Sequence, residues 1–311
     1  MDSIVFQHQE YIDKAKKAIN FYFACNQWSG LKKSNVDNWL ANFSEDLLHK
    51  YYAIRLLSQL LYYSENDMVA MLSEGIFNGV LSKEVLLSCQ VPSGFKMNQQ
   101  DLQFEFRMRL NKTLFVPLLD SNQPYESGNQ ISRILTQQLR IPTPQVTVST
   151  QINDNYNSLD YLIIVDDCIG SGDQCRDFWN EARVSNGNLL SKWCEVNNIK
   201  AYYVVLIGYE DNIKKLEKDL PSLNICCVEL LQEEHKIFSE NSVIWHDSEE
   251  MKEAFKFFSG ITEEFGLELL GYNDLDFAVI MHKNIPDWSL PMFWRKVPDW
   301  DILLERKNSH G

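Results

Sequence analysis

The sequence has no apolar run close to the roughly 20 residues that a helix needs to cross a bilayer. Its first eight residues do not combine a basic segment with an apolar one, as a secretory signal does. Both absences lead us to expect a cytoplasmic protein that neither spans a membrane nor is exported.

Cysteine is sparse, and its seven copies are scattered and odd in number. No pair of them stands with histidines at zinc-finger spacing, and the six histidines are equally dispersed. We therefore expect reduced thiols, with neither a disulfide framework nor a zinc site.

Basic residues are few beside acidic ones, since 29 Lys and Arg against 43 Asp and Glu give a net charge of −14. Phosphate backbones and anionic lipids repel such a surface, so direct binding to nucleic acid or to a membrane is not expected. A basic protein partner or a local basic pocket is still compatible with this charge. Internal repeats and low-complexity tracts are missing as well.

The first third of the chain has the spacing of amphipathic helices. Apolar residues recur at helical spacing over 11–23 and again over 47–62, where Ser44 is the expected N-cap. Ser64 is expected to begin a third helix that runs through Ile76. We place a boundary within 90–112 and predict a helical region over 1–104 and a second domain over 105–311.

Beyond this boundary, strand and helix patterns alternate. Strands are predicted over 113–119, 160–165, 201–207, 224–230 and 275–281, with a further strand-like piece over 242–245. Helices are expected to start at Ser127-Gly128, near Gln174, and at Asp211 as a cap. Strands that alternate with helices predict an α/β domain with a mostly parallel sheet flanked by helices.

The strongest chemical signal is the stretch Tyr161–Gln174. An apolar run leads to two adjacent carboxylates, Asp166 and Asp167, and a loop with Gly170 and Gly172 follows at once. Such acids can accept hydrogen bonds from ribose hydroxyls or hold a hydrated Mg²⁺ ion, and the loop can turn its N–H groups toward a phosphate. The alternative is that the acids only cap a turn, because acids and glycines are common after strands.

This stretch resembles the PRPP-binding motif of type I phosphoribosyltransferases, in which an apolar strand leads to two acids and a phosphate loop. The resemblance implies a type I phosphoribosyltransferase-like fold and a catalytic, ribose-holding role for Asp166 and Asp167. It implies a 5-phosphate loop formed by Gly170, Ser171, Gly172, Asp173 and Gln174. It also implies Mg²⁺ held indirectly by the two acids, and a pyrophosphate loop at Ser127 and Gly128, which read equally well as an ordinary helix start.

Four positions depart from the family pattern. Cys168 stands where an aliphatic residue is usual, and Gly170 stands where a threonine is usual. Asp173 and Gln174 stand where glycine and threonine are usual. A carboxylate beside a phosphate dianion costs free energy unless it is turned away or paired. This departure favours a degenerate phosphate site, whereas the intact acid pair favours catalysis.

A second resemblance covers most of the chain. The segment from Phe277 to Trp294, with Asn284-Ile285-Pro286 and Leu290-Pro291, is similar to the C-terminal part of phosphoribosyltransferase-like proteins of bacterial conflict systems. Members stand beside anti-phage machinery, including retron operons. The resemblance implies an anti-phage effector that binds PRPP or a nucleotide and acts at ribose C1, with other defence proteins or a reverse transcriptase–msDNA complex as partners. The alternatives are a catalytically degenerate nucleotide sensor or assembly module of the same complex, and a plain scaffold.

Overall fold

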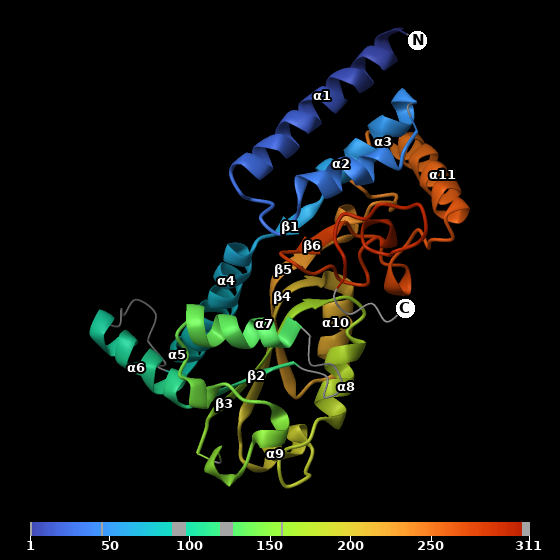
Figure 1. The fold of residues 1–311 in the computed structure, drawn as a ribbon. Helices are drawn as coiled ribbons and strands as arrows, with labels where there is room; N and C mark the ends of the chain where they lie inside the picture. Colours follow the sequence, from blue (N-terminus) through green and yellow to red (C-terminus); the bar gives the residue numbers. More distant parts are fainter. Residues whose placement is uncertain (1, 45, 89–97, 119–126, 157, 307–311) are drawn as a thin grey trace. The chain divides into compact units, whose positions relative to one another are not determined.

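The computed structural model describes residues 2–44, 46–88, 98–118, 127–156 and 158–306 (Figure 1). The chain divides into two compact units, one of Met1–Asp67 with Gln232–Gly311 and one of Met68–Leu231. The predicted division into a helical region over 1–104 and a phosphoribosyltransferase-like domain over 105–311 stays a prediction. None of the helices in the described ranges has the length and apolar content that a membrane span requires.

The unit 68–231 is built on a four-stranded parallel sheet. Its strands are β2 (Thr113–Pro117), β3 (Tyr161–Ile169), β4 (Lys200–Tyr209) and β5 (Leu223–Leu231), in the order β2-β3-β4-β5. Because β3 and β4 are covered on both faces, they are almost continuously apolar. The predicted α/β class with a mostly parallel sheet is confirmed.

Helices cover both faces of this sheet, as Figure 1 shows with α5 on one side of the strands and α8 and α10 on the other. On one face, Tyr203 and Val205 of β4 share a core with α8 (Asp173–Glu181), α9 (Leu190–Val196) and α10 (Glu210–Asp219). The alternate residues of β4 point to the opposite face. There, Val204 contacts the π-helical segment η1 (Glu74–Ser82), and Gly75 is required because a Cβ would lie 2.7 Å from the Val204 side chain.

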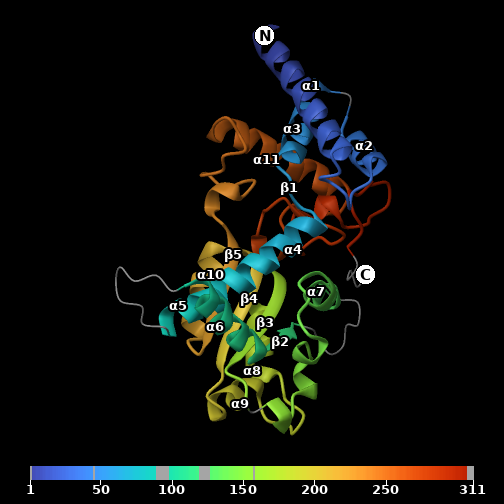
Figure 2. The same cartoon turned by 90° about the vertical axis from the view of Figure 1, so that its left-hand side faces the viewer.

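The remaining helices of this unit precede or follow β2. They are the part of α4 (Glu65–Ser73) from Met68 onward, α5 (Lys83–Ser88), α6 (Gln99–Asn111), α7 (Ser127–Arg133) and the π-helical η2 (Ile134–Gln138). Short 3-10 turns lie at Thr143–Gln145, Ser149–Gln151 and Asp154–Tyr156. Figure 2 views the sheet from the side of α5 and α6.

The chain reverses its direction across the sheet between β2 and β3. After β2 and α7, Val146 forms a parallel bridge with Phe115 of β2, and the Thr147 N–H donates to the Phe115 carbonyl over 3.0 Å. The chain then returns to β3, which pairs with the other side of β2. In open α/β sheets, ligands bind beyond the strand ends at such a switch point.

The other unit holds α1 (Asp2–Ala24), α2 (Lys33–Ala41), α3 (Leu47–Ser58), α11 (Ser248–Glu264) and the first residues of α4. Its two short strands, β1 (Leu61–Tyr63) and β6 (Val279–Met281), pair in parallel, and 3-10 turns lie at Glu233–His235, Tyr272–Asp274 and Pro291–Phe293. Three predictions are wrong here. The late strand covers only Val279–Met281 and pairs with β1. Residues 242–245 form no strand, with bends over 243–245, and Asp46 caps α3 in place of Ser44.

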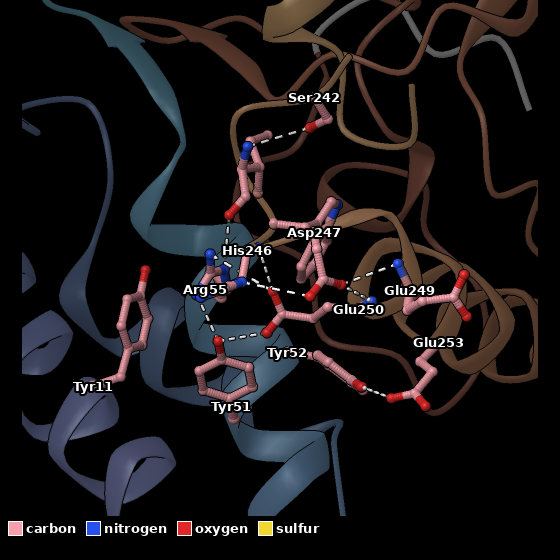
Figure 3. A network of polar contacts seen from close by, with 12 residues as sticks. Tyr11, Tyr51, Tyr52, Arg55, Ser242, His246, Asp247, Glu249, Glu250 and Glu253 are labelled. Atoms are coloured by element: carbon pink, nitrogen blue, oxygen red, sulfur yellow. Dashed lines mark hydrogen bonds and ion pairs between the residues drawn. The ribbon is translucent and has the colours of Figure 1, made fainter. Parts of the chain in front are cut away.

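A polar network joins α3 to α11 and to the segment before it (Figure 3). Arg55 donates to the Ile244 carbonyl over 2.7 Å and to the Tyr51 hydroxyl, which in turn donates to Glu250 over 2.6 Å. Tyr52 donates in the same way to Glu253 over 3.1 Å. Burial raises the pKa of both tyrosines, so their hydroxyls stay protonated and continue to donate at physiological pH.

Candidate functional site

The two acids of the motif lie inside β3, not beyond its end. The strand continues to Ile169 because β4 runs alongside it, with Asp166 opposite Val205 and Ile169 opposite Gly208. Our expectation that the strand stops at residue 165 is therefore wrong. Asp166 and Asp167 are 3% and 6% exposed, so each carboxylate is held in a buried position.

Asp166 points to the sheet face that α8 covers, and both of its oxygens accept hydrogen bonds. The Tyr203 hydroxyl of β4 donates to Oδ2 over 2.7 Å, and the Asp167 N–H donates to Oδ1 over 2.9 Å. Burial, and then the charge of Asp166, raise the pKa of Tyr203 well above its usual value, so its hydroxyl remains a donor. Asp166 is thus an internal anchor that joins β3 to β4.

Asp167 points to the opposite face of the sheet, because neighbouring residues of a strand alternate. It stands two residues beyond the last register pair of β2 and β3, Pro117 with Val165. This position is at the switch point, where the chain after β2 leaves the sheet. Of the two acids, Asp167 is therefore the one suited to meet a ligand.

The loop after β3 has the geometry of an anion site at a helix start. Gly172 has a φ of +85°, which favours glycine, and α8 begins at the next residue. Asn212 of α10 donates to the Gly170 carbonyl over 2.8 Å, and this bond holds the loop against the start of α10. Among the described residues, the N–H groups of Ser171 and Gly172 have no hydrogen-bond acceptor, so they can bind a phosphate oxygen.

The unusual acid of this loop, Asp173, is paired. Ser171 Oγ donates to its Oδ2 over 2.6 Å, and Arg176 Nη1 lies 2.6 Å from its Oδ1. Arg176 also bonds Asp219 over 3.0 Å, which holds the guanidinium in place. The pairing removes much of the expected repulsion between Asp173 and a phosphate, and it also engages the Ser171 hydroxyl. Gln174 follows in the first turn of α8 with an exposed side chain.

The predicted pyrophosphate loop is described only at its end. Ser127 is the first residue of α7, so the predicted helix start at Ser127-Gly128 is confirmed. The preceding segment, 119–126, lies outside the described residues. The role of Ser127 and Gly128 toward pyrophosphate therefore stays a prediction.

The acid pair does not form a direct metal site. The two carboxylates point to opposite faces of β3, so they cannot coordinate one ion together. The described residues contain no group of three His, Cys, Asp or Glu side chains that could hold a metal. These residues do not fit a Mg²⁺ ion that is coordinated by protein groups alone. They are compatible only with an ion whose other ligands are phosphate oxygens of the bound molecule and water.

Three residues of the site were not predicted from the sequence. They are Tyr203, Asn212 and Arg176, which hold Asp166, Gly170 and Asp173. Tyr203 stands inside an apolar run that reads as ordinary core. Arg176 follows Asp173 at helical spacing, and this spacing was the one signal that could have identified the pairing. The predicted cap Asp211 is wrong, because α10 begins at Glu210 and its N-cap is Tyr209, so Asp211 lies inside the first turn.

Comparison with known proteins places the chain in a family. A family model described as PRTase-CE matches residues 36–306 and so spans nearly the whole sequence. No curated protein matches the chain. The parallel α/β sheet flanked by helices is consistent with the fold that the family description implies. The chain therefore belongs to the PRTase-CE family and is a phosphoribosyltransferase-like protein.

Proposed function

We propose that this protein binds a phosphorylated ribose, as PRPP or as a nucleotide, at the carboxyl end of β3. Asp167 accepts hydrogen bonds from the ribose hydroxyls, and the Ser171 and Gly172 N–H groups bind the 5-phosphate. The observation that carries this proposal is the unbroken order of strand, acid, left-handed glycine and helix at the switch point. Membership in the PRTase-CE family supports it.

The reaction that suits this arrangement is substitution at ribose C1. A nucleophile forms a bond to C1 while the bond from C1 to the pyrophosphate oxygen breaks, and pyrophosphate leaves with the electron pair. The buried Asp167 carboxylate stabilises the positive charge that develops on the ribose. Asp166 acts through the strand, because its bonds to Tyr203 and to the Asp167 N–H fix where Asp167 points. Mg²⁺ bound to the pyrophosphate oxygens would neutralise the leaving group.

A second candidate is a sensor or assembly module that binds the ligand without turnover. The bond from Ser171 Oγ to Asp173 favours it, because the hydroxyl is engaged within the loop. A site that keeps its N–H donors but lacks this hydroxyl donor can recognise a phosphate and still bind it less tightly than the usual loop.

The biological setting we propose is bacterial anti-phage defence, with a retron reverse transcriptase–msDNA complex or other defence proteins as partners. This part of the proposal rests on the resemblance to proteins of conflict systems. It is tested by infecting cells that carry the wild-type gene or the Asp167→Asn variant, and equal phage yields would contradict it.

One experiment separates the enzyme from the sensor. PRPP and nucleoside monophosphates are titrated into the protein by calorimetry, with and without Mg²⁺, and each mixture is then assayed for pyrophosphate and free base. Binding with product formation supports a transferase or a hydrolase, and binding without product supports the sensor. The absence of binding to any of these ligands would contradict both.

A further inference from the structure

The loop between β3 and α8 is closed on itself by two hydrogen bonds that join Ser171 and Asp173. Ser171 Oγ donates to the Asp173 carboxylate over 2.6 Å, and the Asp173 N–H donates back to Ser171 Oγ over 3.3 Å. The hydroxyl hydrogen and one N–H group are therefore used within the loop. The N–H groups of Ser171 and Gly172 remain for a ligand, and they match the two terminal oxygens of a phosphate that carries a second substituent.

The charge of Asp173 is only partly neutralised. Arg176 Nη1 lies 2.6 Å from Asp173 Oδ1, but Arg176 Nη2 also bonds Asp219 Oδ2 over 3.0 Å. One guanidinium is thus shared between two carboxylates, and one negative charge of this group remains uncompensated. A phosphate at the loop meets this residual charge, and a second charge on the phosphate makes the repulsion larger.

Asp173 lies close enough to the phosphate position for its charge to change the affinity. Ser171 gives its hydroxyl hydrogen to Asp173 and its N–H to the phosphate, so about 6 Å separate the carboxylate from the phosphate. The Asp173 side chain is 50% exposed, so water screens the repulsion in part. With an effective dielectric constant of about 40, each additional phosphate charge at this distance lowers the affinity by about tenfold.

The outer edge of the loop is open to solvent. Half of the Asp173 side chain is exposed, and Gln174, the next residue of α8, is exposed as well. A phosphate that accepts from the Ser171 and Gly172 N–H groups therefore has room for a second substituent on its solvent side. Such a substituent removes one charge from the phosphate, which relieves the repulsion from Asp173.

We propose that Asp173 makes this loop select a singly charged ribose 5-phosphate, which carries a second substituent, over the doubly charged monoester. This inference rests on the proposed function and narrows its ligand. PRPP and nucleoside monophosphates carry a 5-phosphate monoester with a charge of about −2 at neutral pH, so they bind more weakly than the preferred ligand. The preferred class is a dinucleotide, because its 5-phosphate is linked to a second nucleoside and carries one charge.

The first test compares ribose 5-phosphate with its methyl ester, which has the same ribose and one charge less. Calorimetry at about pH 8, where the monoester is doubly charged, is expected to show about tenfold tighter binding of the ester to the wild type. Asp173→Asn removes the charge but keeps an oxygen that can accept from Ser171 Oγ. This variant is expected to bind the two ligands within about twofold of each other.

Asp177→Asn is the matched control, because it makes the same charge change at an exposed residue one turn further along α8. It is expected to keep the preference for the ester. The ratio of two affinities is measured in each variant, so a partly unfolded sample does not distort the result. A wild type that binds ribose 5-phosphate at least as tightly as the ester would overturn the inference. A preference that Asp173→Asn and Asp177→Asn change equally would overturn it as well.

The same two ligands separate this inference from the proposed function. Asp167→Asn is expected to weaken both by the same factor, because both present the same ribose hydroxyls. Failure of both ligands to bind the wild type, or affinities that Asp167→Asn leaves unchanged, would contradict the proposed function and this inference with it. Binding of both ligands that depends on Asp167, with a preference that does not depend on Asp173, would overturn this inference alone.

The dinucleotide class is tested with two compounds that differ in the link between their nucleosides. Diadenosine diphosphate has a diphosphate link and adenylyl-adenosine a phosphodiester link, and both are compared with AMP. Tighter binding of either compound than of AMP supports the inference and identifies the link that the site accepts. Asp173→Asn is expected to strengthen AMP binding more than dinucleotide binding. Tighter binding of AMP than of both dinucleotides to the wild type would overturn the assignment.

Discussion

Asp166 and Asp167 are neighbours in the chain, but their side chains leave β3 on opposite faces and have different partners. Asp166 accepts from Tyr203 and from the Asp167 N–H, and so holds the strand pair together. Asp167 points to the opposite face of the sheet, at the switch point. Replacing both acids at once would not separate a loss of folding stability from a loss of ligand binding. An Asn at position 166 has an NH2 group in place of one carboxylate oxygen, and this group cannot accept the hydrogen bond from Tyr203 or from the Asp167 N–H. The single replacement Asp167→Asn is the cleaner variant.

Tyr203→Phe tests the anchoring role. It removes a donor from a buried carboxylate, so we expect the free energy of unfolding to fall by about 1–3 kcal/mol. Urea denaturation measures this change, and the exposed Tyr272→Phe serves as the control with little expected effect. A loss no larger for Tyr203→Phe than for Tyr272→Phe would show that Asp166 does not depend on this hydroxyl.

Gly172 and Gly187 form a matched pair for testing the phosphate loop. Their φ angles are +85° and +86°, and an alanine Cβ at either position would meet no atom closer than 3.6 Å. Each Gly→Ala change should therefore cost the same, about 1–2 kcal/mol of folding free energy. Only Gly172→Ala should also weaken PRPP binding, which calorimetry measures. Equal weakening by both variants, or by neither, would remove the loop from the site.

At the scale of single residues, the sequence predicted the acids and the loop but not the groups that hold them. The order of strand, acids and glycines is local, so it can be read from fourteen consecutive letters. Tyr203 is 37 residues from Asp166 in sequence, and only the register of β3 against β4 brings their side chains together. A single sequence carries no signal for that register.

The elements of the sheet were predicted more reliably than their ends. Apolar runs identified β2, β3 and β4, because each is buried enough to need a continuous apolar stretch. The edge strand β5 was also predicted, although only Leu223 and Leu231 at its ends are buried. The polar residues Asp166 and Asp167 concealed the last four residues of β3, since two adjacent acids in the sequence look like the end of a strand. The switch point at Val146 could not be predicted, because a single bridge residue has no periodicity.

Glu84 links helix α5 to β4 and makes this contact sensitive to acid. Glu84 accepts from Lys200 Nζ over 2.7 Å and from the Tyr202 hydroxyl. Burial raises the pKa of Glu84, but the bonds from Lys200 and Tyr202 outweigh it, and the net pKa falls below the usual 4.5. The ionised carboxylate therefore stabilises the fold above pH 4.5, and this contribution is lost as the pH falls through the lowered value.

We accordingly expect Glu84→Gln to lose less stability than the wild type between about pH 5 and pH 3. Urea denaturation at both pH values measures the difference, and Glu181→Gln, an exposed acid of α8, is the control. If the wild type and Glu84→Gln lose equal stability over this range, the contact does not hold Glu84 in its charged form.

The whole molecule carries a charge of −14, which bears on its partners. Binding to the DNA backbone requires cations that replace condensed counterions, and an acidic surface opposes this. We expect no binding to a labelled duplex of about 20 base pairs by fluorescence anisotropy at physiological salt. Micromolar affinity under these conditions would reveal a basic surface that the net charge conceals, and would make msDNA a direct partner.

The central claim is that a phosphorylated ribose binds where β3 meets α8, with Asp167 as its acid. Calorimetric titration of PRPP into the wild type and into Asp167→Asn tests it most directly. The account predicts measurable binding to the wild type and at least roughly tenfold weaker binding to Asp167→Asn, since charged hydrogen bonds contribute about 1.5–3 kcal/mol each. Equal affinity of the two proteins for PRPP, with both folded, would contradict it.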